Sequence, residues 1–364
     1  MKPLSTMKYI KGNVKKFIAL MFTVILSICL LYVSKMIISS FTSSTYHAWV
    51  EPLSNMDVVM PLDKEIDQNI YDSDSFIAST YVSDIFINSA VGRISAYVWF
   101  LDENKFKQLE EITGSKLIEG RYPKDGKNEI VLHMDIAKNK GVVIGDMVGS
   151  EVDSNDSLTG KYEVVGLIDG DALYGMASLP YAKNKYKLAD AQLGAILSKD
   201  ENVKLSGKEG EDYKLYCKDN EEDDLESSGK MMEVTLIVLN FVIILITAFT
   251  LFFVLYIYYL QRKKEFGILM ALGYSRGFVV KRIFGEMVSI VLGGTVVGIL
   301  LSIGIGIGLN GGYFAKNGQK LAVVDGKYFT SPLILVIALC ILSTIPILKL
   351  TKKMDCISII EGEE

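Results

Sequence analysis

Residues that could perform chemistry are scarce in this sequence and form no catalytic pattern. The two histidines, His47 and His133, lie far apart, with no Cys-x-x-Cys, His-Glu-x-x-His or Gly-x-Ser-x-Gly motif near them. Zinc chemistry and a Ser-His-Asp triad need such groupings, so the sequence predicts neither. It also lacks the Gly-x-x-x-x-Gly-Lys-[Ser/Thr] loop that cradles nucleotide phosphates. We expect no catalytic residue, no metal site and no directly bound cofactor, and interpret both histidines as ordinary surface or interface residues.

Carboxylates gather in an acidic run at residues 219–228, Asp-Asn-Glu-Glu-Asp-Asp-Leu-Glu-Ser-Ser. A calcium loop alternates its carboxylates with other residues and needs a turn-forming glycine, whereas the carboxylates here are contiguous. We therefore interpret the run as a solvated linker or stalk.

Residues 262–276, Arg-Lys-Lys-Glu-Phe-Gly-Ile-Leu-Met-Ala-Leu-Gly-Tyr-Ser-Arg, form a charged segment between two long apolar runs. Ile268, Leu269 and Leu272 would cluster on one side of a short helix, and Gly273 would end that helix. The helix would expose an apolar face beside basic residues. Two interpretations remain open on these residues alone: the face docks on a cytosolic partner, or it lies on the membrane surface.

Four runs without charged residues are long enough to cross a bilayer: Phe17–Ser34, Val234–Leu260, Met287–Ala315 and Tyr328–Leu348. Half of the 364 residues are hydrophobic and 22% are charged, so the two kinds must be segregated along the chain. The first run is longer than the apolar part of a signal peptide, and no Ala-x-Ala cleavage site follows it. We expect a retained anchor and four transmembrane helices.

Basic residues flank these runs on one side of the membrane. Lysines precede the first run, Lys and Arg fill the loop between the second and third, and Lys349, Lys352 and Lys353 follow the fourth. Because short basic loops stay inside, both termini should be cytoplasmic. The predicted order is a cytoplasmic N-terminus at 1–16, span 17–39, an extracytoplasmic domain at 40–230, span 233–260, a cytoplasmic loop at 261–282, span 283–312, an extracytoplasmic loop at 313–330, span 331–349 and a cytoplasmic tail at 350–364.

Residues 40–230 are numerous enough for a core of their own. Acidic residues outnumber basic ones there, so we expect no nucleic-acid binding. Of the four cysteines, only Cys217 falls in this segment, which leaves no internal disulfide. The patterns predict strands at Met56–Met60, Ala96–Phe100, Glu129–Leu132 and Tyr162–Ile168, a helix between Asp102 and Gly114, and a hairpin of 147–152 with 161–168. The predicted fold is a membrane α-helical bundle of four transmembrane helices, with an α+β extracytoplasmic domain inserted between helices 1 and 2.

Small and polar residues recur within the second and third spans. Asn240 could hydrogen-bond across helices, and Gly294, Gly298, Gly304 and Gly308 form two Gly-x-x-x-Gly pairs that let backbones approach closely. Packing within the bundle or across a dimer is one interpretation. A polar substrate path is the other, and the absence of charged residues from the span centres weighs against it.

Glu286 stands near the cytoplasmic end of the third span. Burial of its carboxylate would cost several kcal/mol unless the side chain reaches the membrane interface or a basic group pairs with it. Arg282, four residues earlier, is one such basic group. The pair would be either structural or part of a coupling device.

The loop between the second and third spans carries a family resemblance. Its core from Lys264 to Gly273, Lys-Glu-Phe-Gly-Ile-Leu-Met-Ala-Leu-Gly, resembles the loop of FtsX-like permeases of ABC transporters. Glu286, the glycines of the third span and the tail Lys353–Glu361 are similar to the same family. Phe266, Met270 and Cys356 depart from its usual residues.

The predicted outer domain resembles that of MacB-like members of the family. The matching residues are Glu119-Gly120-Arg121-Tyr122-Pro123, Asn128-Glu129-Ile130-Val131, Ala137, Gly145-Asp146 and Tyr162-Glu163-Val164-Val165-Gly166. From about residue 171 to 230 the resemblance is weak, and the sequence predicts no fold there.

The resemblance implies a non-catalytic permease in a bacterial plasma membrane, paired with a second permease as a homodimer or heterodimer. A cytosolic ABC ATPase would bind ATP and Mg²⁺ and dock on a coupling helix formed by Lys264, Glu265, Phe266, Gly267, Ile268, Leu269, Ala271, Leu272 and Gly273. Its motion would pass to the outer domain by mechanotransmission. The output would be export or extraction of hydrophobic or amphipathic compounds such as antimicrobial peptides; the alternative is regulation of an outer partner such as a cell-wall hydrolase or sensor kinase. From a different class, an ATPase-independent receptor or adhesion protein is also open.

Overall fold

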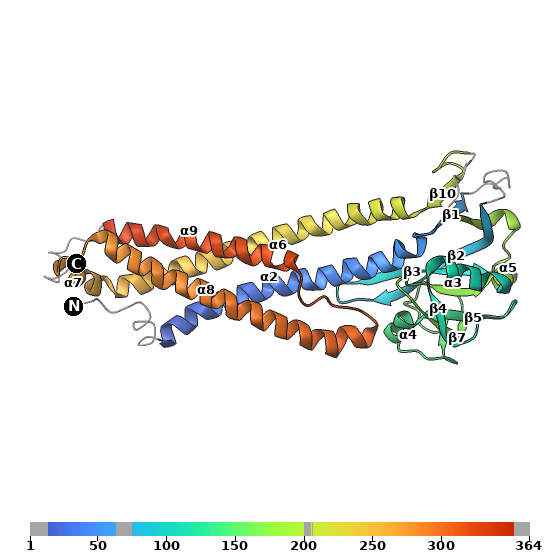
Figure 1. The fold of residues 1–364 in the computed structure, drawn as a ribbon, viewed down its shortest axis with the longest axis horizontal. Coiled ribbons are helices and arrows are strands. Elements are labelled where there is room, and N and C mark those ends of the chain that lie inside the picture. Colours follow the sequence, from blue (N-terminus) through green and yellow to red (C-terminus); the bar gives the residue numbers. More distant parts are fainter. Residues whose placement is uncertain (1–13, 63–74, 200–204, 206, 353–364) are drawn as a thin grey trace. The chain divides into compact units, whose positions relative to one another are not determined.

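A computed structural model describes residues 14–62, 75–199, 205 and 207–352 (Figure 1). The chain divides into two units. The helical unit comprises Met1–Met36, Glu233–Gly308 and Ala322–Glu364, and the sheet unit comprises Ile37–Met232 and Leu309–Leu321. Most of the predicted N-terminal segment and the tail motif from residue 353 lie outside the described residues.

Long apolar helices build the helical unit. Within the described residues, three helical stretches are long and apolar enough to cross a membrane: Leu20–Leu53, Lys218–Gln261 and Arg276–Asn317. The predicted fourth span, 331–349, lies within the helix Thr330–Lys352, and the apolar helical stretch found in this region of the described residues, Gly326–Ile341, is shorter. The count of four spans therefore remains a prediction. The helices that contribute to this unit are α2 (Val14–Trp49), α6 (Lys218–Gln261), α7 (Lys263–Ala271), α8 (Arg276–Leu309) and α9 (Thr330–Lys352).

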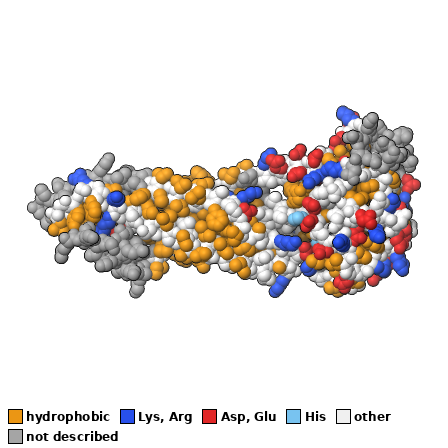
Figure 2. Space-filling view, viewed as in Figure 1, with side chains coloured by type: hydrophobic (Ala, Val, Ile, Leu, Met, Phe, Trp, Pro, Cys, Tyr) orange, Lys and Arg blue, Asp and Glu red, His pale blue; other side chains and the backbone are white. Residues whose placement is uncertain are grey.

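The helical unit is apolar both inside and outside. Its core joins one face of each helix, with Ile28, Leu251, Met287 and Leu335 among the buried side chains. Large apolar side chains also cover its surface, as Figure 2 shows. A helix that is hydrophobic all round suits a membrane rather than water.

The acidic run at 219–228 belongs to the first turns of α6 and is mostly exposed, which is compatible with the expected solvated stalk. Asp219 and Glu221 lie in the first turn, where carboxylates interact favourably with the exposed N–H groups and the helix dipole. The helix therefore begins fifteen residues before the predicted span 233–260.

A mixed sheet forms the core of the sheet unit. Its order is β10-β1-β9-β2-β3-β8-β5-β7-β4, and β6 pairs with β7. The β3–β8 and β5–β7 pairs are parallel and the other pairs are antiparallel. The strands are β1 (Met56–Pro61), β2 (Phe76–Asn88), β3 (Arg93–Leu101), β4 (Lys116–Gly120), β5 (Glu129–His133), β6 (Met147–Val148), β7 (Tyr162–Asp169), β8 (Gly175–Ser178), β9 (Gly194–Ser198) and β10 (Tyr213–Tyr216).

Apolar side chains cover both faces of this sheet. Val98 and Phe100 of β3 enter one core, with α4 (Met134–Lys140) and α5 (Leu179–Tyr186). Trp99 and Leu101, one residue along, enter the other core with α3 (Phe106–Thr113). Successive side chains of a strand point to opposite faces, so a strand buried on both faces reads as a continuous apolar run.

The predicted strands and helix of this unit are present. The four predicted strands coincide with β1, β3, β5 and β7, and Gly114 ends α3 with a left-handed φ of 69°. The predicted hairpin forms between β6 and β7, but β6 stops at Val148. Gly149 ends it because its φ is 111°, and a Cβ there would lie 2.4 Å from the Gly160 carbonyl oxygen.

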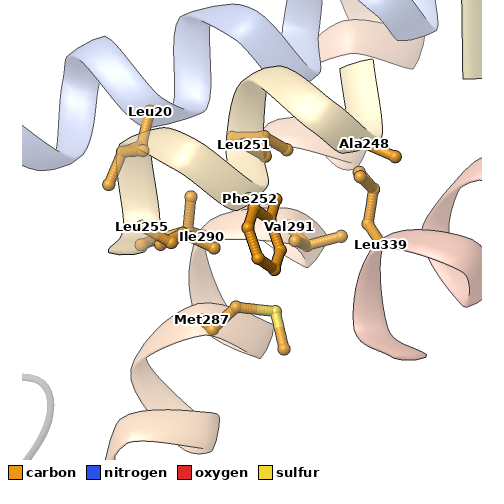
Figure 3. A pocket seen from close by; sticks show the side chains of 9 residues that line it. All are labelled: Leu20, Ala248, Leu251, Phe252, Leu255, Met287, Ile290, Val291 and Leu339. Carbon is orange, nitrogen blue, oxygen red and sulfur yellow. The ribbon is translucent and has the colours of Figure 1, made fainter. Parts of the chain in front are cut away.

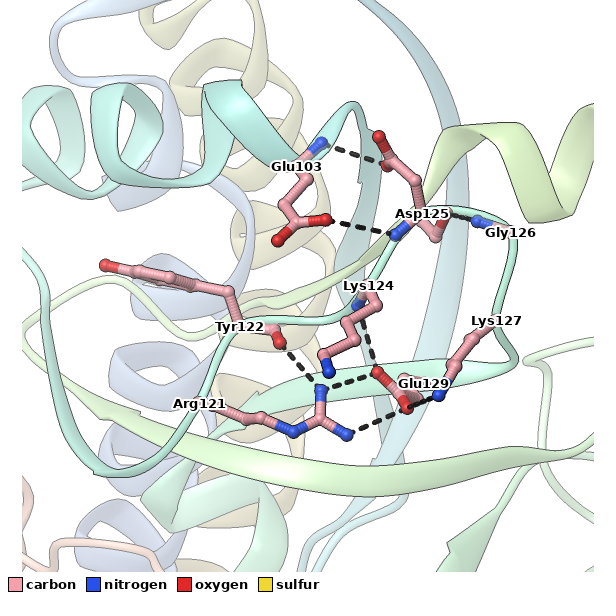
Figure 4. A network of polar contacts seen from close by, with 9 residues as sticks. Glu103, Arg121, Tyr122, Lys124, Asp125, Gly126, Lys127 and Glu129 are labelled. Carbon is pink, nitrogen blue, oxygen red and sulfur yellow. Dashed lines mark hydrogen bonds and ion pairs between the residues drawn. The ribbon is translucent and has the colours of Figure 1, made fainter.

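The MacB-like motif around Arg121 is a structural clamp (Figure 4). Nη1 and Nη2 of Arg121 donate to the two carboxylate oxygens of Glu129 at 2.6 and 2.8 Å, and the Lys124 backbone N–H donates to the same carboxylate at 2.9 Å. The guanidinium of Arg121 lowers the pKa of Glu129 to about 2. Gly166 faces the clamp, since a Cβ there would lie 2.5 Å from the Arg121 carbonyl oxygen.

His133 is buried, so its interpretation as a surface residue is wrong. Its Nδ1 accepts the Asp135 N–H at 3.1 Å and caps α4, and its Nε2 donates to the Gly170 carbonyl at 3.0 Å. Both ring nitrogens are satisfied, so burial costs little, and burial lowers the pKa of His133. His47 is half-buried, and its Nδ1 donates to the neighbouring Asp171 carbonyl at 2.9 Å.

Part of the predicted outer loop 313–330 is fastened to the sheet unit. Nδ2 of Asn139 donates to the Asn317 carbonyl at 2.9 Å, and Ser40 Oγ donates to the Lys320 carbonyl at 2.9 Å. Gly318, with φ of 62°, lies so close to α4 that a Cβ would be 2.1 Å from the Asp135 carbonyl oxygen. We call residues 309–321 the strap.

Candidate coupling site

The segment singled out by its charge forms the short helix α7 of nine residues. Glu265 lies in its first turn, where a carboxylate is favourable. The helix ends as predicted at Gly273, whose φ is 90°, and the Tyr274 N–H bonds back to the Leu269 carbonyl at 3.2 Å. The hydroxyl of Ser275 then accepts the Phe278 N–H at 3.3 Å at the start of α8.

The helix α7 has an inner and an outer side. Phe266 and Met270 are buried in the core of the helical unit, and Leu269 packs partly against it. Ile268 and Leu272 are 56% and 71% exposed. The expected exposed face therefore exists, but Leu269 belongs to the inner side. Of the other predicted coupling residues, Lys264, Ala271 and Gly273 are exposed, Glu265 is half-buried and Gly267 is buried.

Arg262, between α6 and α7, holds the inner side in place. Its Nη1 donates to Glu286 Oε2 at 2.6 Å, and its Nε and Nη2 donate to the two oxygens of Glu265 at 2.8 and 3.2 Å. The same guanidinium lies against the rings of Tyr258 and Phe266, with its carbon 5.3 and 4.8 Å from their centroids. One side chain thus contacts the end of α6, α7 and α8.

The charged side chains around Arg262 balance one another. The side chains of Arg262 and Glu286 are 6% and 1% exposed. Arg282 Nε lies 3.6 Å from Glu286 Oε1, which makes an ionic contact without a hydrogen bond. Two arginines and two carboxylates give a neutral cluster, and loss of one member would leave an uncompensated buried charge. Burial opposes the charged form of Arg262, but the hydrogen bonds to Glu265 and Glu286 outweigh it and raise the pKa of Arg262.

The expected pairing of Glu286 with Arg282 is present, and Arg262 is a second, closer partner. The closer partner, Arg262, is 24 residues away in the chain, so helical spacing could not identify it. In the sequence, Arg262 is one of several basic residues between the second and third apolar runs, and nothing local distinguishes it from the others.

Buried polar contacts join α6 to two further helices. Nδ2 of Asn240 donates to Ser331 Oγ on α9 at 3.2 Å. The hydroxyls of Thr247 and Ser27 on α2 are 2.7 Å apart. Together with the Arg262 contacts, these bonds give α6 a polar link to each of α2, α8 and α9. Such links fix the register of helices that apolar packing alone leaves free to slide.

The four predicted glycines of α8 fall into two groups. Gly294 and Gly298 face α2, where an added Cβ would lie 2.9 Å from Val24 and 2.8 Å from Ile28. Gly304 and Gly308 meet no described atom within 4 Å of such a Cβ. The first pair thus permits close packing within the helical unit, and the second pair is open.

A small cavity in the helical unit is apolar (Figure 3). Its volume of about 10 Å³ is at the lower limit for one water molecule. This cavity cannot serve as a polar path for a substrate. It is lined by Leu20, Ala248, Leu251, Phe252, Leu255, Met287, Ile290, Val291 and Leu339.

Comparison with known proteins finds a family model that matches the part of the chain containing this site. Residues 237–354, which contain α7, its two flanking helices and α9, match the family model described as FtsX-like permease C-terminal. This part of the chain is similar to the C-terminal domain of FtsX-like permeases. Members of this family are membrane components of transporters that do not themselves catalyse a reaction.

The crystal structure of the periplasmic region of MacB from Actinobacillus actinomycetemcomitans is similar to part of the chain. The sequence identity is 15% and the TM-score is 0.28, over 48% of this chain and 94% of the MacB chain. No curated protein matches the sequence significantly.

Proposed function

We propose that this chain is the permease subunit of an ATP-driven ABC transporter complex, and that α7 docks on a separate cytosolic ATPase that binds ATP and Mg²⁺. The observation that carries the proposal is the two-sided structure of α7. Ile268 and Leu272 are presented outward, while Phe266, Met270 and Arg262 fix the helix to the bundle. An exposed apolar pair on a braced helix suits a partner that pushes on it.

The basic residues that flank the spans support a topology for this complex. Four spans in a bacterial plasma membrane would place both termini and α7 in the cytoplasm and the sheet unit outside. A second permease, the same chain or a related one, would complete the complex. Motion of α7 would reach the sheet unit through helices that continue into it along the chain, since α2 and α6 each belong to both units.

The output would be export or extraction of hydrophobic or amphipathic compounds such as antimicrobial peptides. Support comes from the apolar cavity among the described residues of the helical unit, which is too small to hold a polar cargo. Regulation of an outer partner, such as a cell-wall hydrolase or sensor kinase, is the alternative. Stimulation of the complex's ATP hydrolysis by peptides favours export, and stimulation by a partner protein alone favours regulation.

Docking is tested by co-purification of ATP hydrolysis with the tagged chain from its own host. Ile268→Asp and Leu272→Asp should each remove the ATPase, because a carboxylate replaces an apolar contact. Ile118→Asp is the matched control, since Ile118 is 52% exposed in the sheet unit. Full retention of the ATPase by both α7 variants would contradict the assignment. The receptor or adhesion alternative predicts that no ATPase co-purifies even with the unaltered chain.

A further inference from the structure

We propose that Arg262 is a positioning residue that fastens α7 to α8, so that the two helices move as one body when a partner pushes on α7. The inference rests on the proposed function, because it concerns how force applied at α7 is passed on. It assigns to Arg262 and Glu286 the task of directing that force into α8.

The C-terminal end of α7 is joined to α8 by a tight turn. Only Leu272 to Ser275 separate the two helices. The turn is closed by the bond from the Tyr274 N–H to the Leu269 carbonyl and by the Ser275 cap of α8. This end of α7 therefore cannot move far from the start of α8.

The N-terminal end of α7 is joined to α8 at a different level. Arg262 donates to Glu286, which lies ten residues into α8, or about 15 Å along its axis. The nine residues of α7 span about 13 Å, so its two ends match two points on α8 at nearly the same spacing. A helix held at both ends by the same neighbour cannot pivot against it.

Arg262 is suited to this task because its partners differ in exposure. Glu286 is almost fully buried, whereas the side chain of Glu265 is 39% exposed. Separation of Arg262 from Glu286 would leave a carboxylate in an apolar core, so this contact should persist while the outer face of α7 is loaded. Glu265 keeps the guanidinium oriented from the α7 side through two hydrogen bonds.

A merely structural ion pair and a fastening pair predict different behaviour in the double variant Arg262→Met, Glu286→Met. Replacement of both members of a buried pair by apolar residues of similar volume is often neutral for stability. A structural role therefore predicts a normal complex. A fastening role predicts a stable complex in which a movement of α7 is no longer followed by a movement of α8.

The test is hydrogen exchange of the intact complex with its ATPase, in ATP-free and vanadate-trapped states. With the unaltered chain, exchange should differ between the states both in α7 and in α8 around residues 279–290. In the double variant the difference in α7 should remain and the difference in α8 should fall by more than half. Arg262→Lys, which keeps a charge toward Glu286, should retain part of the α8 difference.

An undiminished α8 difference in a double variant that co-purifies with the ATPase would overturn the fastening role. If the double variant does not assemble, the Arg262→Lys complex decides instead, and an α8 difference equal to that of the unaltered chain overturns the proposal. Failure of the proposed function looks different: no ATPase would co-purify with the unaltered chain, or ATP would leave exchange in α7 unchanged.

Discussion

The sheet unit and the helical unit each contain a short arginine–glutamate contact. The first contact is local in the chain, whereas the second joins separate helices. Arg121 and Glu129 lie eight residues apart in one loop and strand, with the arginine side chain 46% exposed. Arg262 and Glu286 are 24 residues apart, both almost fully buried, and belong to different helices. The first pair shapes a loop within one subdomain. The second joins elements that could otherwise move separately, which is why we assign coupling to it.

The largest effect should come from breaking the buried pair in the helical unit. Arg262→Met removes the 2.6 Å partner of Glu286 and leaves, among the described residues, the 3.6 Å ionic contact to Arg282, so we expect a loss of about 3–5 kcal/mol in the free energy of unfolding. Thermal unfolding in detergent measures the change. Arg93→Met removes an exposed arginine of the sheet unit and should lower the melting temperature far less. Equal decreases in melting temperature for Arg262→Met and Arg93→Met would contradict a special contribution of the buried pair to stability.

A smaller loss is expected from the clamp in the sheet unit as the pH falls. The pKa of Glu129 is lowered from 4.5 to about 2 in the folded protein, so its contribution is complete above about pH 4.5 and is lost as the pH falls toward 2. We expect about 2 kcal/mol, because solvent screens the half-exposed Arg121. Stability measured between pH 6 and pH 2 should show this loss, and Glu129→Gln should flatten it. An identical pH profile in the variant would argue against the clamp.

Attachment of the strap to the sheet unit should be sensitive to substitution of a single glycine, Gly318. Gly318→Ala forces a side chain into the α4 carbonyl at a left-handed φ, which we expect to cost on the order of 1–3 kcal/mol and to release the strap. Limited proteolysis within residues 309–321 reports the release. Gly326→Ala is the control, because a Cβ there meets nothing within 4 Å and φ is not left-handed. Equal proteolysis of both variants would show that the strap is not held by this contact.

The two glycine pairs of α8 should differ in how much an alanine substitution destabilises the helical unit. Gly298→Ala places a Cβ 2.8 Å from Ile28, and we expect overpacking of about 1–2 kcal/mol. Gly304→Ala, on the same helix, meets nothing within 4 Å and should be close to neutral in an isolated chain. Melting temperatures in detergent test both. A larger effect at Gly304 than at Gly298 would mean that a partner, rather than α2, decides the packing.

Local signals in the sequence predicted the parts of the fold that depend on local physics. Gly273 and Gly114 end helices because only glycine adopts their backbone angles easily, and β-branched runs marked β5 and β7. The strand β2 was missed because Ser79, Ser83 and Asp84 interrupt its apolar pattern. Tertiary pairing with β3 and β9 forms that strand nevertheless.

Contacts between distant segments were beyond the reach of sequence patterns. The spacing of four residues suggested Arg282 for Glu286, but the shorter contact is to Arg262 across the α6–α7 turn. The burial of His133 depends on the Gly170 carbonyl, which β7 brings to it from another part of the chain. The resemblance marked Arg121 and Glu129, but only the geometry shows that they hold a loop in shape.

Site-specific photo-crosslinking at Leu272 tests the central claim most directly, because it also decides between a protein partner and the membrane surface. A photoreactive residue at Leu272, which is 71% exposed, should crosslink to the ATPase in intact cells, and one at Val143, 65% exposed in the sheet unit, should not. Crosslinks from Leu272 to lipid alone, with none to an ATPase, would contradict the assignment of α7 as the coupling helix.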